Sequence, residues 1–262
     1  MPAETGSRKI GLARALSKLG YCSRSRATEL ICAGQVRLNA KLSRDPEAPV
    51  RLELDTIEVD GRAVESERKV YLAMNKPRGL VTTADDEKGR ETVYSILHHS
   101  EENLPWVAPV GRLDKASEGL LLFTNDSEWA ARVAAPETHL EKTYHVQIGT
   151  LADTNFIRTV TRGVRTKDGD FLTATSCSLL RTGEKNCWLE ITLDEGKNRQ
   201  IRRLIKTLSV EVLRLVRVAI GPLELGTLPK GTYRHLRPDE RQSIDHAMLA
   251  KQRKPQPRDT SA

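Results

Sequence analysis

The chain lacks the residues and runs that would mark it as a metal protein, a membrane protein or an exported protein. Its four cysteines have no Cys-x-x-Cys spacing and no histidine partners at zinc-finger spacing, so we expect reduced thiols and no metal site. The longest strongly apolar stretch, from Leu120 to Phe123, is far too short to span a bilayer. The N-terminal segment MPAETGSRK has no apolar run behind its charges. We therefore expect a cytoplasmic protein without a membrane anchor.

Aromatic residues are also scarce, at 4% of the 262 residues, so any nucleic-acid binding should rest on charge and shape more than on stacking. The formal net charge is +7, and the basic residues gather near the N-terminus. Residues 8–44 contain nine lysines and arginines but a single acid, Glu29. The net positive charge of this segment is therefore larger than that of the whole chain. We expect these basic residues to contact phosphates. They are Arg8, Lys9, Arg14, Lys18, Arg24, Arg26, Arg37, Lys41 and Arg44.

The same N-terminal region has the pattern of two short helices followed by a strand. Residues 10–20 have the spacing of a helix with Leu12, Leu16 and Leu19 on one face and the basic residues turned away from it, and Gly20 ends that helix. A second helix begins near Ser23 or Ser25 and stops at Gly34, and residues 36–39 alternate as a strand. With SRSRATELICAGQVRLNAK at its centre, the pattern resembles the small RNA-binding module first recognised in a small-subunit ribosomal protein. Ala40 replaces the glycine that usually completes an Asn-Gly turn there, so we expect a looser turn.

A polar stretch at residues 65–69 is the natural linker to the rest of the chain. Beyond it the sequence predicts strands at 70–74, 120–123, 142–148 and 188–193, with helices from Ser127 and over 156–164. This mixed order predicts an α+β fold built on a largely antiparallel sheet. We expect a flexible N-terminus over 1–9, a small RNA-binding domain over 10–64, a linker over 65–69, a larger catalytic domain over 70–241, and a disordered basic tail over 242–262.

The segment from Gly111 to Asp126, GRLDKASEGLLLFTND, places one carboxylate, Asp114, on a turn beside an arginine and before an apolar strand. From spacing alone, a structural aspartate at a glycine-rich turn is as good an explanation as a catalytic one. The segment closely resembles the signature of the pseudouridine synthases that act on bacterial ribosomal RNA, in which this aspartate is catalytic. Ser117 and Ser127 depart from the usual threonine and glycine, and both changes are small.

The resemblance implies conversion of uridine to pseudouridine. This reaction breaks the bond between the ribose and the base nitrogen, turns the uracil and rejoins it through carbon 5, so no cofactor or metal is needed. The site must supply a carboxylate, a cation that keeps it ionised and a pocket for a base removed from its stack. Asp114 would attack the ribose, attack the base or abstract a ribose proton, and all three routes need the same residue.

A second segment, EGKNRQIRRLIKTL at residues 195–208, has the geometry of an amphipathic helix. Its apolar face consists of Ile201, Leu204, Ile205 and Leu208. Arg199, Arg203 and Lys206 cluster on the opposite face, where they would touch phosphates, although for Arg203 and Lys206 an ordinary solvated face is the better explanation. Arg202 lies at the border, and a half-buried guanidinium favours a carboxylate partner. The resemblance implies that Arg202 pairs with Asp114.

Two more residues enter the site through the resemblance, and Arg112 enters it through its spacing from Asp114. Tyr144 would ordinarily pack on the core, but the family places a tyrosine here against the flipped base, where it would stack and assist the proton transfer from carbon 5. Leu215 matches a pocket-lining residue, although core packing explains it equally well. Arg112 precedes Asp114 by two positions, so on an extended turn it would face the same side and meet a phosphate or help to open the duplex. The segment KPRG that begins at Lys76 resembles a family loop near the site, without a task for its lysine.

The expected function is the site-specific isomerisation of uridine in ribosomal RNA, by a monomer that acts on this RNA or on a ribosomal precursor particle. The runs EGKNRQIRRL and RLVRVAIGPL are more similar to the large-subunit synthases, and a small-subunit synthase is the alternative. A non-catalytic RNA-binding or ribosome-assembly protein would need only the charge and the basic helices. The joint presence of Asp114, Tyr144 and Arg202 favours the enzyme.

Deletion of residues 8–44 should weaken RNA binding and flatten its dependence on salt, because each lost phosphate contact removes nearly one unit of slope from a plot of log affinity against log salt. The remaining domain should still fold if the linker carries few contacts. Titrations of ribosomal RNA at several salt concentrations measure the slope, and an unchanged slope would argue against phosphate contacts by this segment.

Overall fold

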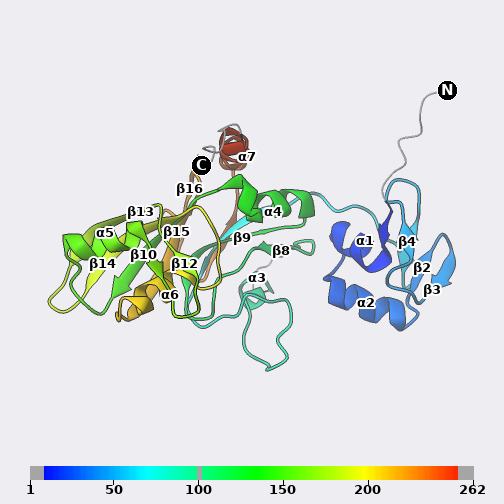
Figure 1. Cartoon of the computed structure of the whole chain (residues 1–262). Coiled ribbons are helices and arrows are strands. Elements are labelled where there is room, and N and C mark those ends of the chain that lie inside the picture. The colour runs from blue at the N-terminus through cyan, green and yellow to red at the C-terminus, as the bar shows by residue number, and fades with distance from the viewer. Residues whose placement is uncertain (1–8, 99–101, 253–262) are drawn as a thin grey trace, which may run out of the picture. The chain divides into compact units, whose positions relative to one another are not determined.

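The computed structural model describes residues 9–98 and 102–252, and it divides into two compact units (Figure 1). The first unit contains the described residues up to Tyr71, together with those of Ser100–Ala108 and Phe123–Ser127. The second contains the described residues of Leu72–His99, Pro109–Leu122 and Glu128–Ala262. Both units combine helices and strands, which confirms the predicted α+β class.

In the first unit, two helices pack against a small antiparallel sheet with the strand order β3-β2-β5-β6. A core of leucine, isoleucine, valine and alanine side chains, including the fully buried Leu12, Leu16 and Ile31, joins the helices to the sheet. The predicted helix, helix and strand are therefore all present in this order. The elements are β1 (Ile10–Gly11), α1 (Leu12–Lys18), α2 (Arg24–Cys32), β2 (Val36–Leu38), β3 (Lys41–Ser43), β4 (Pro49–Val50), β5 (Ile57–Val59) and β6 (Arg62–Ala63).

The ends of these elements follow local chemistry. Ser23 caps α2, since its side chain accepts a hydrogen bond of 3.1 Å from the backbone N–H of Arg26. The turn between β2 and β3 contains only Asn39 and Ala40, which have φ angles of 50° and 65°. The expectation of a looser turn at Ala40 was therefore wrong: the hairpin keeps a two-residue turn. The alanine adopts a left-handed conformation, which costs roughly 1–2 kcal/mol.

The linker prediction also needs correction, because contacts cross the sequence boundary at residues 65–69. The backbone N–H of Glu67 donates to the carbonyl of Leu19 over 3.0 Å, and that of Trp106 donates to Gly20 over 2.9 Å. Residues 8–44 also supply α1, α2, β2 and β3. Their deletion would therefore remove most of the core of the first unit, so substitution of exposed basic residues such as Arg37 and Lys41 is the cleaner form of the salt experiment.

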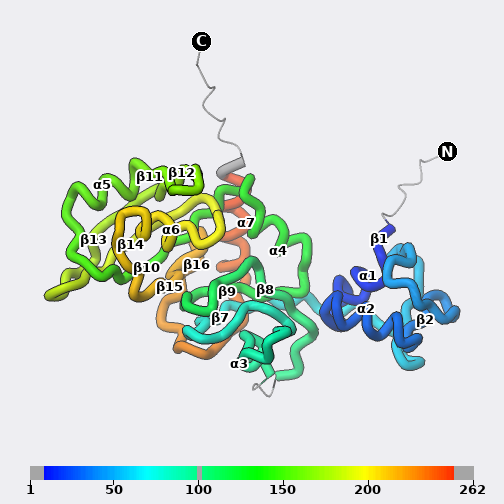
Figure 2. The backbone as a smooth tube through the Cα atoms, turned by 60° about the horizontal axis from the view of Figure 1, so that its bottom comes forward, coloured from blue at the N-terminus to red at the C-terminus, as the bar shows by residue number. Residues whose placement is uncertain are grey.

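The second unit is built on a larger sheet in which the strands run in the order β13-β14-β10-β15-β9-β7-β17. The pairs β13–β14, β14–β10, β10–β15 and β17–β7 are antiparallel, whereas β15–β9 is parallel. Figure 2 shows β7, β8 and β9 next to one another. The sheet strands and their attached pairs are β7 (Tyr71–Lys76), β8 (Ala108–Val110), β9 (Glu118–Thr124), β10 (Lys142–Ile148), β13 (Ser176–Thr182), β14 (Cys187–Leu193), β15 (Val212–Ile220), β16 (Leu223–Glu224) and β17 (Tyr233–His235).

Helices α5 and α6 share one apolar core with strands β10, β14 and β15, so they cover the same face of the sheet. The helix α6 buries the predicted residues Ile201, Leu204 and Ile205, while Leu208 lies just beyond its end and is only partly buried. The remaining elements are α3 (Tyr94–His98), α4 (Ser127–Ala134), the 3₁₀ turn η1 (Pro136–Thr138), α5 (Thr154–Arg162), β11 (Val164–Arg165), β12 (Phe171–Leu172), α6 (Gln200–Thr207) and α7 (Pro238–Gln252).

The helix α7 corrects the prediction of a disordered tail from residue 242. Pro238 begins this helix and acidic residues fill its first turn, both of which favour a helix start. Ile244 and Met248 are buried four residues apart, and the indole N–H of Trp129 donates to Asp245 over 2.9 Å. The few apolar residues of this helix are surrounded by charged ones, so the composition of the segment predicted disorder. Residues 253–262 of the predicted tail, and residues 1–8 of the predicted flexible N-terminus, lie outside the described part.

One glycine fixes the approach of two central strands. Gly119 of β9 has a φ of +100°, and a Cβ atom at this position would lie 2.2 Å from the carbonyl oxygen of Arg217 on β15. No side chain larger than hydrogen fits between these parallel strands. The same close approach places the start of β9 directly beside the middle of β15.

We expect Gly119→Ala to lower the free energy of unfolding by about 3 kcal/mol or more, because it adds a backbone clash to the strain of a positive φ. Gly79→Ala is the matched control: Gly79 has a φ of +105°, but a Cβ there would have no neighbour within 4 Å. This variant should lose only about 1–2 kcal/mol. Denaturant unfolding of the two variants measures the difference, and equal losses would contradict the clash.

Candidate active site

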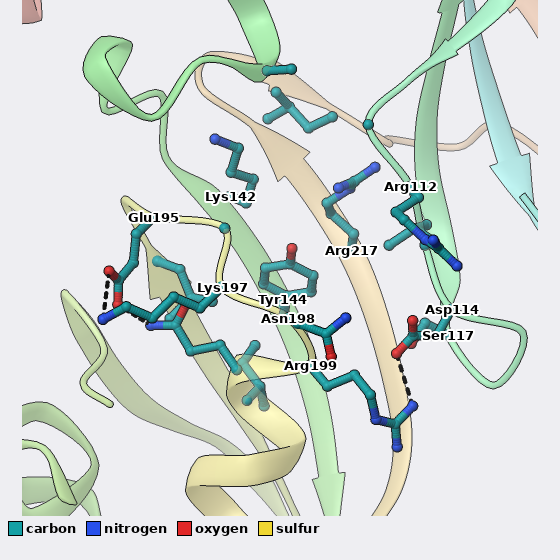
Figure 3. Close-up of a pocket in the computed structure, with 18 of the residues that line it drawn as sticks. Arg112, Asp114, Ser117, Lys142, Tyr144, Glu195, Lys197, Asn198, Arg199 and Arg217 are labelled. Carbon is teal, nitrogen blue, oxygen red and sulfur yellow. Dashed lines mark hydrogen bonds and ion pairs between the residues drawn. The ribbon is translucent and has the colours of Figure 1, made fainter. Parts of the chain in front are cut away.

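A pocket of about 640 Å³ opens in the second unit on the face of the sheet that α6 covers. Segments that lie far apart in the sequence line it, among them the loop with Arg112 and Asp114, the loop at the start of α6, strand β10 and strand β15 (Figure 3). Its volume lies within the range of sites that hold small molecules or single nucleosides. The predicted residues Asp114, Tyr144, Leu215 and Arg112 all line this one pocket.

Asp114 lies in the loop between β8 and β9, and the exposed fraction of its side chain is 26%. The backbone N–H of Ser117 donates to the Asp114 carbonyl over 2.9 Å and closes the turn. The Thr82 hydroxyl donates to the Leu113 carbonyl over 2.8 Å and ties the loop down just before the aspartate. The carboxylate is therefore presented at the edge of the pocket by a loop that is fixed on both sides.

Lys76, to which the sequence analysis assigned no role, binds the backbone of this loop. Its side chain is fully buried, and the Nζ atom donates to the carbonyls of Asp114, Ser117 and Pro77 over 3.2, 2.9 and 3.1 Å. Burial lowers the pKa of the Lys76 ammonium to about 8, although the negative charges of Glu118 and Asp114 oppose this shift. The strand β7 continues to Lys76, two residues beyond the predicted end, and this extension carries the ammonium under the loop.

The cation that pairs with Asp114 is Arg199, and the predicted pairing with Arg202 was wrong. The Nη1 atom of Arg199 lies 2.9 Å from Oδ2 of Asp114. Arg199 immediately precedes α6 with a φ of +49°, a conformation that a regular helical projection does not anticipate. Arg199 was predicted to lie on a phosphate-binding face, but in the structure it forms this ion pair instead. Both side chains of the pair remain partly exposed.

Arg202 supports the backbone of the same loop. Its Nη2 atom donates to the Ala116 carbonyl over 2.9 Å and its Nη1 atom donates to the Val212 carbonyl over 3.2 Å. Burial, with the neighbouring positive charge of Arg199, lowers the pKa of the Arg202 guanidinium, while the charge of Asp114 opposes this. The prediction of a half-buried position for Arg202 agrees with the structure. Its partners are carbonyl groups because the first turn of α6 lies beside the Ala116 peptide.

Tyr144 on β10 and Leu215 on β15 lie on the pocket face of the sheet. Tyr144 is partly exposed, and its ring stands in the pocket in Figure 3. Leu215 is 7% exposed, pairs across the strands with Val146 and belongs to the core cluster. Both predicted interpretations of Leu215, pocket lining and core packing, therefore apply together. Arg112 is exposed at the rim.

Among the pocket residues that the sequence analysis missed are two buried polar ones, Gln200 and Arg217. Gln200 is 3% exposed, and its amide donates to the Thr173 carbonyl over 2.9 Å. Arg217 is 6% exposed although it is charged, and it occupies an inward-facing position of β15. An arginine two residues after an inward leucine in an alternating strand was the signal that could have identified it.

The basic residues predicted to contact RNA are mostly at the surface of the first unit. Lys18 is half-buried, and Arg8 lies outside the described residues. Arg26 forms an exposed ion pair of 2.8 Å with Glu29, which is weak enough to leave it available to a phosphate. The exposed members of the set are Lys9, Arg14, Arg24, Arg26, Arg37, Lys41 and Arg44. In the second unit Lys206 is exposed, whereas Arg203 is ion-paired with Asp170.

Over residues 9–98 and 102–252, no cluster of three or more histidine, cysteine, aspartate or glutamate side chains is arranged to hold a metal ion. In the same residues, no helix has the length and apolar character needed to cross a membrane.

Comparisons with known proteins identify the family of the chain. Residues 70–207 match the family described as RNA pseudouridylate synthase, and residues 10–55 match the S4 domain. The chain is 35% identical over 233 residues to an uncharacterized RNA pseudouridine synthase of Aquifex aeolicus (strain VF5), a match that covers 88% of this chain and 92% of that protein. It is also 35% identical over 231 residues to the ribosomal large subunit pseudouridine synthase B of Bacillus subtilis (strain 168), covering 87% of this chain and 93% of that one.

A solved structure described as a pseudouridylate synthase superposes with a TM-score of 0.62 and 26% identity, covering 90% of this chain and 99% of the other. The family match spans more than half of the chain, and each of the two relatives aligns over most of its own length and most of this chain. The chain therefore belongs to the RNA pseudouridylate synthase family, whose members are isomerases, and it carries an S4 domain before the synthase domain.

Proposed function

We propose that the protein isomerises a specific uridine of large-subunit ribosomal RNA, with Asp114 as the catalytic carboxylate. The observation that carries this proposal is the ion pair between Asp114 and Arg199 at the edge of a nucleoside-sized pocket that Tyr144 also lines. The similarity over 87% of the chain to a protein named as a large-subunit synthase supports the choice of subunit. The protein acts as a monomer in the cytoplasm, on ribosomal RNA or on a precursor particle.

The geometry suits each step that the isomerisation requires. Arg199 binds the Asp114 carboxylate through an ion pair of 2.9 Å and so fixes its orientation at the edge of the pocket. Lys76 and Arg202 hold the loop backbone, so the carboxylate keeps its position while the base turns. Tyr144 stacks on the flipped uracil, and its hydroxyl assists the loss of the proton from carbon 5. Each possible reaction of Asp114, at the ribose or at the base, needs its carboxylate at this position in the pocket.

The first unit binds the RNA around the target. Its exposed basic residues, among them Arg14, Arg24, Arg37 and Lys41, are suited to phosphate oxygens because they are long, charged and at the surface. Arg112 at the pocket rim would meet a phosphate next to the flipped nucleotide. These contacts position the RNA, while the pocket recognises the base.

Asp114→Asn should abolish pseudouridine formation on ribosomal RNA, by about 10³-fold or more, while RNA binding stays near the wild-type level. The amide keeps the shape of the side chain but carries no charge, so it neither acts as a carboxylate nor pairs with Arg199. Asp168→Asn is the matched control, since Asp168 lies on an exposed turn outside the pocket. Normal activity of purified Asp114→Asn would refute the assignment, and absence of activity in the wild type on any ribosomal RNA would favour a non-catalytic RNA-binding protein.

Pseudouridine mapping in ribosomal RNA from cells with and without this gene tests the target. We expect one modification to disappear from the large-subunit RNA and to return when the wild-type gene is restored, but not when Asp114→Asn is supplied. Loss of a modification from the small-subunit RNA instead would replace the large-subunit assignment and keep the enzyme.

A further inference from the structure

Arg217 is a buried cation of the pocket for which the proposed mechanism has no use. Its Nε atom donates to the Leu120 carbonyl over 2.7 Å. Its Nη2 atom is buried and has no hydrogen-bond partner in the described part of the chain. With only 6% of the residue exposed, water cannot freely replace a missing partner, and a buried unpaired donor costs about 1–3 kcal/mol or more when charged.

The position of Arg217 is fixed by its neighbours on both sides. On β10 its cross-strand neighbour is Tyr144, and on β9 it lies beside Gly119, whose missing side chain permits the close approach of the strands. Cross-strand neighbours of this kind have Cβ atoms on the order of 5 Å apart. In Figure 3 the Arg217 side chain extends past the hydroxyl end of Tyr144 within the pocket. A group placed against this ring therefore also meets Arg217.

Three cations near the pocket have acidic partners, whereas Arg217, like Lys76 and Arg202, has none. Arg199 is paired with Asp114, and Lys197 lies 3.0 Å from Glu195. Arg214, on the same strand as Arg217, donates to the buried carboxylate of Glu118 over 3.0 and 3.1 Å. Among the described residues, no carboxylate lies within ion-pair distance of Arg217. A desolvated guanidinium without an acid is stabilised when a ligand supplies the acceptor.

The flipped base is the ligand that can supply it. Uracil carries carbonyl oxygens at positions 2 and 4, which are acceptors, and the guanidinium has only donors and stays charged. When the bond from the ribose to N1 breaks, its electron pair stays on the uracil, and the resulting negative charge spreads onto these oxygens. If the carboxylate instead adds to the base, the charge again moves onto the carbonyl oxygen at position 4. Negative charge thus develops at a carbonyl oxygen in each of these routes.

We infer that Arg217 donates through Nη2 to a carbonyl oxygen of the flipped uracil and stabilises the negative charge on the base while it is detached or activated. This inference rests on the proposed function. Arg217 transfers no proton: it acts as a fixed positive charge in a site with little water, where such a charge is most effective. The buried position also separates it from Arg112, whose exposed place at the rim suits a phosphate.

The same contact would help to distinguish uracil from cytosine. Cytosine has an amino group at position 4, and an arginine aimed at that position would place two donors against each other. A site built to pair one acceptor rejects a base that lacks it, because the buried donor is left unpaired. If the carbonyl at position 2 is the partner, both bases offer it and no discrimination follows, so the identity of the acceptor decides the specificity.

The test compares Arg217→Met and Arg217→Lys with wild type in single-turnover reactions on a ribosomal RNA fragment that carries the mapped target. Arg217→Met should lower the rate constant by about 10²–10³-fold at saturating enzyme, with RNA affinity little changed, and Arg217→Lys should recover part of the rate. Arg181→Met is the control, since Arg181 is exposed on β13, outside the pocket, and lies over the Trp188 ring at 4.7 Å.

Substrates with sulfur at position 2 or position 4 of the target uridine identify the contact, because sulfur is a poorer acceptor than oxygen. One of the two replacements should change the rate in wild type and have no further effect in Arg217→Met, which is the coupling expected of two groups in contact. Inactive wild type would defeat the proposed function, whereas active wild type with an equally active Arg217→Met would defeat only this inference.

Two other outcomes would also overturn the role of Arg217. A salt slope lower by about one unit, with an unchanged rate at saturation, would make it a phosphate contact. Arg217→Met could instead lose the same rate on the uridine substrate and on both sulfur-substituted substrates, with a lower melting temperature and no recovery in Arg217→Lys. This result would make Arg217 a structural residue.

Discussion

The active-site loop depends on hydrogen bonds from a buried lysine to peptide oxygens. Lys76 lies beneath the turn that carries Asp114 and donates to carbonyls at both ends of that turn. Arg202 reaches the same turn from α6 through the Ala116 carbonyl. Because both cations bind backbone oxygens, neither neutralises the Asp114 carboxylate, which remains available to Arg199 and to substrate. Three cations thus contact this loop, and of these Arg199 alone pairs with the Asp114 carboxylate.

The strands beside the loop complete this arrangement. Glu118, the first residue of β9, is buried and accepts hydrogen bonds from Arg214 on β15 and from Lys230. Burial alone would raise the pKa of the Glu118 carboxyl, but these hydrogen bonds and charges more than offset it, so the net pKa is lowered. The Glu118 side chain is buried, whereas those of Arg214 and Lys230 are about half exposed. The carboxylate therefore anchors β9 to β15 at the point where Gly119 brings them together.

The sequence predicted the features that depend on local pattern. Alternation located β10 at its observed bounds, apolar spacing located the buried face of α6, and the motif around Asp114 located the pocket. What it missed depends on exact geometry in three dimensions. Arg199, rather than Arg202, pairs with Asp114 because the residue before α6 has a left-handed conformation. Lys76 reaches the loop because β7 is two residues longer than predicted. The helix α7 was missed because its two buried residues are surrounded by charged ones.

Recognition through peptide oxygens has a consequence for how this loop can evolve. A carbonyl is present whatever the side chain, so the bonds from Lys76 and Arg202 place no demand on the identities of the residues that they hold. Lys115 is exposed and Ala116 contributes to these bonds only its backbone oxygen. Sequences can therefore drift at these two positions, next to a fixed carboxylate, without loosening the scaffold around it. The motif would then preserve its aspartate and its distant cations more strictly than the residues between them.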